Sequence, residues 1–327
     1  MTGAPRIAVL VPCYNEAASI AQVVQDFRAA LPSAQIYVYN NNSTDDTEHL
    51  ARTHGALVRR EKLPGKGNVV RRMFSDVEAD LYVLVDGDGT YDAAAAPEMI
   101  DRLIGDRLDM VNGARVTEIA AAYRHGHRMG NALLSGLVAR IFGSRIRDLL
   151  SGYRVFSRRF VKSFPAASHG FEIETELTVH ALQLRMPLGE IDTVYRDRAA
   201  GSSSKLRTYA DGAVILRTII LLVKDERPLL FFSLAAAVLS FTSLALALPV
   251  VLEFYRTHLV PRLPTAVLAM GIMLLAFLAL ACGLVLDSVA HGRAETRRMH
   301  YLAIPLLAAE DAAVSGDHSP GASRLGS

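Results

Sequence analysis

Two long stretches without charge constrain the fold of this chain more than any other feature. Leu229–Leu252 has no charged residue in 24 positions, and Thr265–Leu286 has none in 22. At about 1.5 Å rise per residue, each is long enough as a helix to cross a hydrocarbon core of roughly 30 Å. We therefore expect a transmembrane hairpin with spans at about 229–252 and 265–287. The alternative, two buried helices of a large soluble domain, is disfavoured by two such stretches in succession.

Basic residues around these stretches predict the orientation of the hairpin. Seven Lys and Arg lie in 196–227 and three more, Arg293, Arg297 and Arg298, follow the second stretch, whereas the connecting loop has only Arg256 and Arg262. The positive-inside rule then places both termini in the cytoplasm. The N-terminal segment lacks a basic n-region and a small-residue cleavage site, so no cleavable signal peptide is expected. We expect a multi-pass protein of the cell inner membrane.

Charge and cysteine content exclude other classes of function. The net charge is only +2, and no basic stripe with interleaved aromatic residues is present, so nucleic acid is not an expected partner. The only cysteines are Cys13 and Cys282, the second inside an expected span, which disfavours a disulfide framework or a cysteine metal site. His125 and His127 have i,i+2 spacing and no third ligand, which makes a poor zinc site.

The first ~115 residues alternate between strand-like and helix-like patterns. This alternation predicts an α/β fold with a mostly parallel, Rossmann-like sheet covered on both faces. In such sheets ligands bind beyond the carboxyl ends of the strands. Strands are predicted over 6–11, 35–39, 57–60, 81–85 and 109–113, and helices over 16–30, 43–54, 68–78 and from Pro97 onward.

Polar clusters follow three of these strands at the point where each strand ends. The first strand runs into "PCYNE", the second into "NNNSTDD" and the fourth into "DGDGTYD". Three independent elements thus bring polar side chains to one edge of the sheet. This is the geometry of a binding site.

Asp86-Gly87-Asp88 is the most informative of these clusters. Two carboxylates at i and i+2, after an apolar strand and with glycine between them, can face one hard divalent cation. Mg²⁺ and Mn²⁺ take oxygen ligands and often share them with substrate phosphates. The alternative is an ordinary Asp-Gly turn, and the position after a fully apolar strand favours the cation site.

Taken in order, the motifs resemble the family 2 glycosyltransferases, which have the GT-A fold. Within that family the chain is most similar to the polyprenyl-phosphate sugar synthases, the dolichyl-phosphate mannose and glucose synthase group. The resemblance covers roughly residues 5–290. Its motifs are "VPCYNE" at 11–16, "NNNSTDDT" at 40–47, "GKGNVVRRMF" at 65–74, "DGDGTYD" at 86–92, "SGYRVFSRR" at 151–159 and "GSSSKL" at 201–206, followed by the membrane hairpin.

The resemblance implies a domain organisation. We expect a cytosolic GT-A domain over 1–204, a juxtamembrane segment with an interfacial helix over 205–228, the hairpin over 229–290, and a partly disordered cytosolic tail over 291–327. A further helical segment is expected over 124–143.

The resemblance also implies which residues bind the donor. Asp88, with Asp86, is the expected ligand of Mg²⁺ or Mn²⁺. Asn40 and Asn41 stand where the family commonly has aspartates, so a UDP-sugar and a GDP-sugar both stay open. Gly89-Thr90 stands where many relatives have Leu-Gln. The implied donor-binding residues are Pro12, Tyr14, Glu16, Asn41, Asp45, Lys66, Asp86, Gly87, Asp88 and Arg115.

Basic residues are implied around the phosphates, because arginine suits phosphate oxygens. Near the membrane, the alternative role of Lys205 and Arg198 is attraction of acidic lipids. Arg154 is a weaker candidate, with pairing inside the fold as its alternative. The implied residues that bind the acceptor or its phosphate are Arg128, Arg198, Ser203 and Lys205.

The catalytic residues implied are Asp148, Arg128 and Asp88, with Asp148 as the base or as a group that positions the acceptor. Glu174 and Glu176 are the alternatives for that role. Glu172, Glu174 and Glu176 alternate with other residues, however, and could instead line the wet face of a strand.

The expected reaction is an inverting transfer of a hexose or hexosamine from a nucleotide sugar to a polyprenyl phosphate, in cell-envelope glycan biosynthesis. A single transfer to a lipid-linked glycan or polysaccharide precursor is the alternative reaction. The oligomeric state stays open between a monomer and a homo-oligomer. A processive synthase is disfavoured because the chain has no tryptophan for a Q-x-x-R-W element. A dinucleotide oxidoreductase would need glycines in "PCYNEAAS". A non-catalytic anchor or partner-binding module is disfavoured by the intact acidic and basic motif residues.

Overall fold

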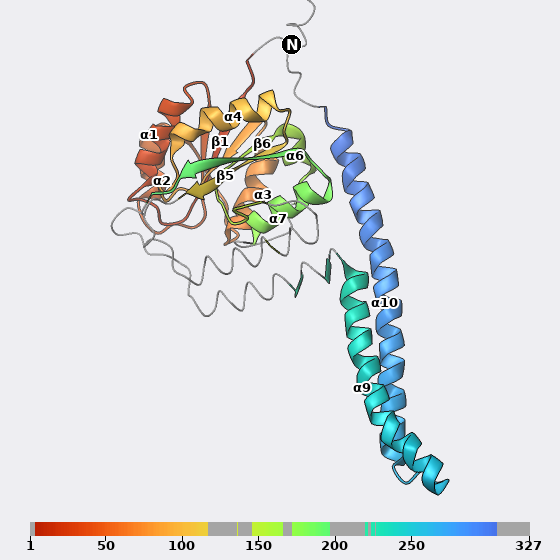
Figure 1. Cartoon of the computed structure of the whole chain (residues 1–327). Helices are drawn as coiled ribbons and strands as arrows, with labels where there is room; N and C mark the ends of the chain where they lie inside the picture. The colour runs from red at the N-terminus through yellow and green to blue at the C-terminus, as the bar shows by residue number, and fades with distance from the viewer. Residues whose placement is uncertain are drawn as a thin grey trace, which may run out of the picture. The chain divides into compact units, whose positions relative to one another are not determined.

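The computed structural model of the chain describes residues 4–116, 136, 146–165, 172–196, 220–221, 224–225 and 227–305. The chain divides into two compact units, which are described separately (Figure 1). Of the described residues, the first unit holds 4–116, 146–165, 172–196 and 301–305, and the second holds 227–300 with the few described residues before it.

Seven strands form one sheet in the described part of the first unit. Their spatial order is β3-β2-β1-β4-β6-β5-β7, and only β6 runs antiparallel to its two neighbours. The sheet is therefore mostly parallel, as the alternating pattern predicts. The strands are β1 (Ile7–Cys13), β2 (Gln35–Asn40), β3 (Leu57–Arg60), β4 (Leu81–Leu84), β5 (Met110–Val116), β6 (Arg154–Ser157) and β7 (Leu188–Val194).

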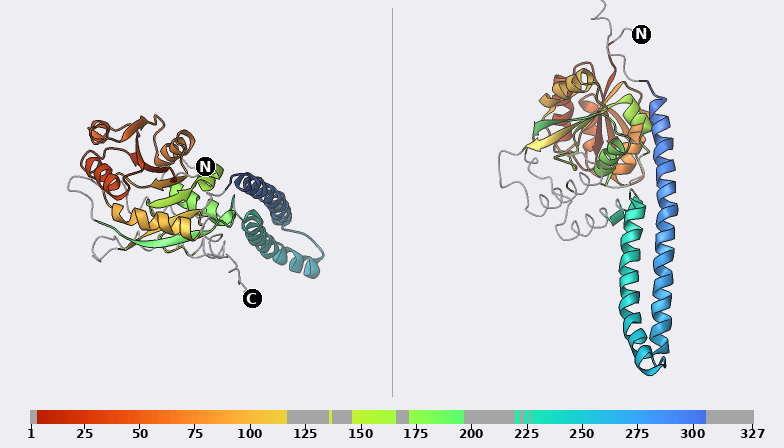
Figure 2. Two further views of the ribbon diagram at one scale, coloured as in Figure 1. Left: turned by 90° about the horizontal axis from the view of Figure 1, so that it is seen from above. Right: turned by 45° about the vertical axis from the view of Figure 1, so that its right-hand side comes forward.

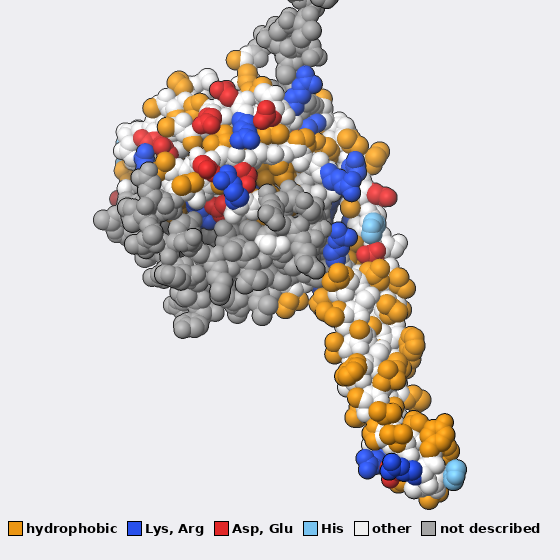
Figure 3. All heavy atoms as spheres, in the orientation of Figure 1, with side chains coloured by type: hydrophobic (Ala, Val, Ile, Leu, Met, Phe, Trp, Pro, Cys, Tyr) orange, Lys and Arg blue, Asp and Glu red, His pale blue; other side chains and the backbone are white. Residues whose placement is uncertain are grey.

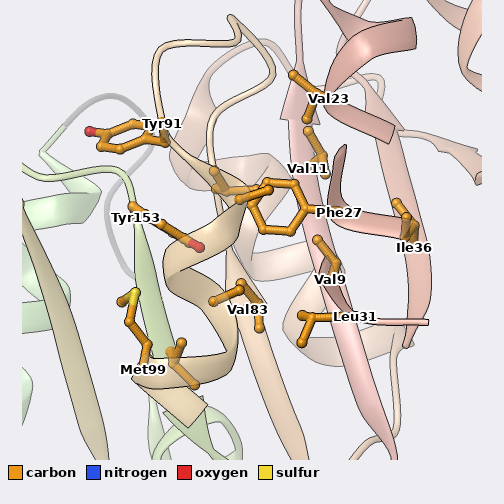
Figure 4. Packing of buried hydrophobic residues seen from close by; sticks show 14 of the residues in the cluster. Val9, Val11, Val23, Phe27, Leu31, Ile36, Val83, Tyr91, Met99 and Tyr153 are labelled. Atoms are coloured by element: carbon orange, nitrogen blue, oxygen red, sulfur yellow. The ribbon is translucent and has the colours of Figure 1, made fainter. Parts of the chain in front are cut away.

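Helices cover both faces of this sheet, because its central strands β1 and β4 are apolar on both sides. In β1, Val9 and Val11 join the cluster packed against α1 and α4, whereas Ala8 and Leu10 join the cluster packed against α3, α6 and α7. Figure 4 shows the first cluster, with Phe27 of α1 beside Val9 and Val11. The helices are α1 (Ile20–Ala30), α2 (Thr47–Thr53), α3 (Lys66–Asp76), η1 (Ala93–Ala95), α4 (Ala96–Gly105), α6 (Arg158–Ser163) and α7 (Ile173–Gln183).

The segment around Glu174 is a helix, so the strand alternative for it is wrong. Ile173 and Leu177 of α7 are fully buried and lie one helical turn apart, in the cluster under α3. A helix period therefore fits the apolar residues here, and the alternation of the glutamates is incidental.

At the N-terminal end of β5, four residues form what we call the Asp109 cluster. Asp109 is fully buried and accepts hydrogen bonds from the hydroxyls of Ser157 (2.6 Å) and Tyr301 (2.7 Å) and from the guanidinium of Arg159. The Arg159 guanidinium also lies 4.9 Å from the centre of the Tyr301 ring. Tyr301 belongs to the first unit, so this cluster ties residues far apart in sequence into one core.

The second unit contains two long helices, α9 (Pro228–Thr257) and α10 (Leu263–Leu302), and the expected spans lie within them. Both are long and apolar enough to cross a membrane. They run side by side as a hairpin (Figure 2), and apolar side chains cover their outer surface (Figure 3). The expected helices over 124–143 and within 205–228 lie outside the described residues, apart from isolated positions.

Small residues form the contact between α9 and α10. Ala236 and Ser243 are buried on α9, and Ala269, Ala276 and Gly283 are buried on α10, each set at a seven-residue spacing. This spacing is typical of helices that pack with a left-handed crossing. The Ser243 hydroxyl donates a hydrogen bond to the Ala269 carbonyl (2.7 Å), which satisfies a polar group inside an apolar hairpin.

Candidate active site

The two carboxylates of the "DGDG" stretch follow β4 and lie at the carboxyl edge of the sheet. Glycines make this arrangement possible. A Cβ at Gly87 would lie 2.5 Å from the sulfur of Cys13, which ends β1, and a Cβ at Gly152 would overlap the Asp86 carboxylate. The loop before β6 therefore closes directly over Asp86.

Lys66, at the start of α3, forms ion pairs with both Asp86 and Glu174, the second at 2.6 Å. Its side chain is only 9% exposed. Burial alone would lower the pKa of Lys66, but the two carboxylates outweigh burial and raise it. Lys66 is therefore a permanent cation, and it joins the loop after β4 to the first turn of α7.

One oxygen of Glu174 is unusual. Oε1 accepts from Lys66, whereas Oε2 is buried and has no hydrogen-bond partner among the described residues. A buried carboxylate oxygen without a donor costs free energy. The first turn of α7 therefore keeps an acceptor available at this edge.

Arg115, at the end of β5, holds Asp148 in a bidentate ion pair. Nε and Nη2 of Arg115 donate to the two carboxylate oxygens at 2.6 and 2.8 Å, and the backbone N–H of Arg115 adds a third bond at 3.2 Å. Burial would raise the pKa of Asp148, but the hydrogen bonds and charge of Arg115 outweigh it and lower this pKa. The Arg115 guanidinium also lies 5.4 Å from the Tyr195 ring centre.

Arg154 is fully buried, so its place is inside the fold. It donates to the backbone carbonyls of Leu149 (2.7 Å) and Ser151 (3.0 Å) and to the Thr178 hydroxyl (2.7 Å). These bonds fix the loop that carries Asp148 and Gly152. Arg154 thus stabilises this loop at the carboxyl edge of the sheet.

The polar residues after β1 and β2 form a second rim at the same edge. The backbone N–H of Glu16 donates to the Thr47 hydroxyl (2.8 Å), and the Asp45 carboxylate accepts from the backbone of Ala17 (3.1 Å) and from Thr47. Pro12 lies near the end of β1, whereas Tyr14 lies in the loop that these bonds fix and is 45% exposed.

Asn41 shapes the loop that leads to Lys66. Its amide donates to the carbonyls of Glu61 (2.9 Å) and Leu63 (2.7 Å), and its oxygen accepts from the Gly65 N–H (2.8 Å). Asn40 donates instead to Glu48 (2.9 Å). A cavity of about 680 Å³ lies beside these residues, lined by Asn40, Asp45, Glu48, Arg60 and others.

The carboxylates at this edge fit a divalent cation that completes its coordination with ligand oxygens. No group of three or more His, Cys, Asp or Glu that could enclose a metal exists among the described residues. Asp86 is engaged by Lys66, whereas the Thr90 hydroxyl donates to one oxygen of Asp88. A cation held by Asp88 would need further oxygens from a bound phosphate, as Mg²⁺ and Mn²⁺ commonly do.

Some predicted site residues cannot be placed. Arg128, Arg198, Ser203 and Lys205 lie outside the described residues, so their roles stay predictions. Conversely, sequence reasoning missed the contacts of Thr90, Gly152 and the Lys66–Glu174 pair. The glycine of "SGYR" was a usable signal for a close approach, but pairing of side chains 108 positions apart leaves no mark in a single sequence.

Carboxylates and cations thus gather at one edge of a mixed, mostly parallel sheet, and the chain belongs to glycosyl transferase family 2. The model of that family matches residues 8–164. The chain is 35% identical to glycosyltransferase AglJ of Haloferax volcanii, over 76% of this chain and 82% of that protein. It is 28% identical to the dolichyl-phosphate hexose transferase of the same organism, over 68% of this chain and 95% of the relative.

Solved structures agree on the fold. Glucosyl-3-phosphoglycerate synthase of Mycobacterium tuberculosis, crystallised with Mn²⁺, UDP-glucose and glycerol 3-phosphate, matches with a TM-score of 0.55 at 22% identity. The match covers 67% of this chain and 79% of the synthase. The GT-A fold is thereby confirmed, and the chain is a glycosyltransferase.

Proposed function

We propose that this glycosyltransferase transfers a hexose or hexosamine from a UDP- or GDP-sugar to a polyprenyl phosphate at the membrane. The main support for this proposal is that two features occur in one chain. Asp86, Asp88, Lys66 and Arg115 gather at the carboxyl edge of the sheet, and two helices long enough to span a membrane follow. A lipid acceptor is the substrate that would require both. The dolichyl-phosphate hexose transferase relative supports this choice.

Asp88, with Asp86 beside it, would hold Mg²⁺ or Mn²⁺. A divalent cation there supplies charge stabilisation to the leaving diphosphate. The Mn²⁺ and UDP-glucose in the crystallised synthase support this assignment. Lys66 and Arg115 add two fixed positive charges for the same anionic groups.

The acceptor does not need a strong base. The second pKa of a phosphate monoester is about 6, so the acceptor oxygen is largely deprotonated at neutral pH. Asp148 suits a positioning role better than a basic one, because Arg115 lowers its pKa and binds both of its oxygens. In this proposal Asp148 fixes the plane of the Arg115 guanidinium, which then meets phosphate oxygens. Attack of the acceptor from the face opposite the leaving group inverts the sugar carbon.

The test uses the full chain, purified in detergent, with polyprenyl phosphate and radiolabelled UDP-glucose, UDP-GlcNAc or GDP-mannose in parallel. We expect an organic-soluble, acid-labile product with one donor. Asp88→Ala should reduce the rate by roughly a thousandfold or more, because it removes the main cation ligand. The variant should still unfold in one cooperative thermal transition, which separates loss of chemistry from loss of fold.

Two results would overturn the proposal. Absence of a lipid product with all three donors would redirect the reaction to a lipid-linked glycan or polysaccharide acceptor. Full activity of the Asp88→Ala variant would place the cation elsewhere.

A further inference from the structure

Thr90 occupies an unusual place directly behind the proposed cation ligand. It is fully buried, with 0% exposure, although its side chain is polar. Its hydroxyl donates to Oδ1 of Asp88 at 2.6 Å, and its backbone N–H donates to the same oxygen at 3.2 Å. Asp88 is itself only 6% exposed.

The turn alone explains the backbone bond but not the hydroxyl bond. Gly89 has φ +74°, a conformation that glycine adopts easily, and this bends the chain so that the N–H of Thr90 meets Asp88. Any residue at 90 except proline would supply that N–H. The hydroxyl adds a short bond to an ionised oxygen, which is the strong kind of hydrogen bond.

Residues just beyond the edge strand β7 hold the backbone around Thr90. The Thr90 carbonyl accepts from the backbone N–H of Arg196 (2.8 Å), just beyond β7. Next to it, Tyr91 pairs with Tyr195 as an isolated bridge, and Asp92 lies 3.3 Å from Arg196 in an ion pair. The backbone that carries the Thr90 side chain is therefore held in place by the residues just beyond β7.

We propose that Thr90 is a positioning residue that orients the Asp88 carboxylate for the divalent cation. The inference rests on the proposed function, because it takes Asp88 as the cation ligand. Two donors on Oδ1 stop rotation of the carboxylate and set the direction of its other oxygen. Groups that orient metal ligands typically change metal affinity by 10–100-fold when removed.

The experiment measures Mn²⁺ binding directly, by the electron paramagnetic resonance signal of free Mn²⁺, with purified full chain plus UDP in one arm and GDP in the other. Thr90→Val keeps the shape of the side chain and removes the hydroxyl, whereas Thr90→Ser keeps the hydroxyl. We expect Thr90→Val to weaken Mn²⁺ binding by about tenfold or more, and Thr90→Ser to stay within about twofold of the parent. The Mn²⁺ concentration that gives half-maximal transfer should rise in parallel.

Thr193→Val is the matched control. Thr193 is also buried, at 1% exposure, but its hydroxyl donates to the Ala114 carbonyl (3.3 Å). It should lose some thermal stability and leave Mn²⁺ affinity unchanged.

The outcomes distinguish a failure of the positioning role of Thr90 from a failure of the proposed transferase function. Equal Mn²⁺ affinity of the parent and Thr90→Val overturns the positioning role and leaves the proposed function standing. Failure of the parent chain to bind Mn²⁺ with either nucleotide overturns the cation assignment itself. Weakened binding in both Thr90→Val and Thr193→Val would show a general effect of losing a buried hydroxyl, and it also contradicts the inference.

Discussion

Strand β5 has a buried arginine–aspartate pair at each of its ends, and the two pairs are completed differently. At the N-terminal end, the Asp109 cluster draws donors from β6, from α6 and from Tyr301. At the carboxyl end, Asp148 receives three hydrogen bonds from Arg115. The first pair lies away from the ligand edge and is held from several elements, whereas the second joins the end of β5 to the loop before β6 at the ligand edge.

The difference indicates that the same type of ion pair has two roles in this protein. Removing one member of a buried pair leaves an uncompensated charge, which costs folding energy at either end. Only at the carboxyl edge does the surviving arginine also face the place where a substrate would bind. The N-terminal pair should therefore control stability alone, and the carboxyl pair should control stability and activity together.

The largest expected effect comes from breaking each pair in turn. Asp109→Asn should lower the free energy of unfolding by about 3–5 kcal/mol and leave the rate of the folded fraction within about twofold. Asp148→Asn should reduce the transfer rate by roughly a hundredfold, because a displaced guanidinium misplaces the phosphate. Thermal unfolding in detergent and initial rates with saturating substrates measure both. A rate loss in Asp109→Asn equal to that in Asp148→Asn would remove the distinction.

A smaller effect is expected from acid, which should change the stability of the parent protein and of Asp148→Asn differently. The pKa of Asp148 is lowered in the folded protein, so this group stabilises the fold above the ordinary carboxyl pKa of about 4 and loses that contribution as the pH falls through the folded value. Stability should thus decline on acidification. Asp148→Asn has no such carboxyl, so its unfolding free energy should fall less steeply below about pH 5. Parallel slopes in the two proteins would contradict the lowered pKa.

The smallest effect is expected at Tyr301. Tyr301→Phe removes one of the hydroxyls that donate to Asp109 but keeps the ring beside Arg159, so stability should fall by about 1 kcal/mol. The transfer rate and the Mn²⁺ affinity should not change. Ser157→Ala, which removes the other hydroxyl donor, should behave alike, and a change in rate in either variant would link the N-terminal pair to catalysis.

Sequence alone predicts much of the fold, because burial leaves a pattern in the strands. β3 matches its predicted range, and β1, β2 and β4 shift by at most two residues at either end. The strands β6 and β7 were not predicted, because charged residues interrupt their apolar pattern: β6 begins with Arg154, and β7 contains Glu190 and Asp192. The predicted helix start at Ser43 is four residues early, because Ser43 accepts a hydrogen bond from the backbone N–H of Asn15 and Asp45 accepts one from the backbone N–H of Thr47.

The site was predictable in part for a similar reason. Strands that end in polar residues locate the edge, so Asp86 and Asp88 could be placed there from their position alone. Which groups pair at that edge could not be deduced, because Lys66 meets Glu174 and Arg115 meets Asp148 only through the order of strands in the sheet. The same residue types would form other pairs in another topology.

The hydrogen bond between Tyr301 and Asp109 also has a consequence for synthesis of the chain. The two residues are 192 positions apart, and both apolar helices lie between them. At about 5–20 residues per second, a ribosome needs roughly 10–40 s to travel that distance. During this interval Asp109 has Ser157 and Arg159 as donors but not Tyr301, so this contact of the catalytic domain forms only after both apolar stretches have been synthesised.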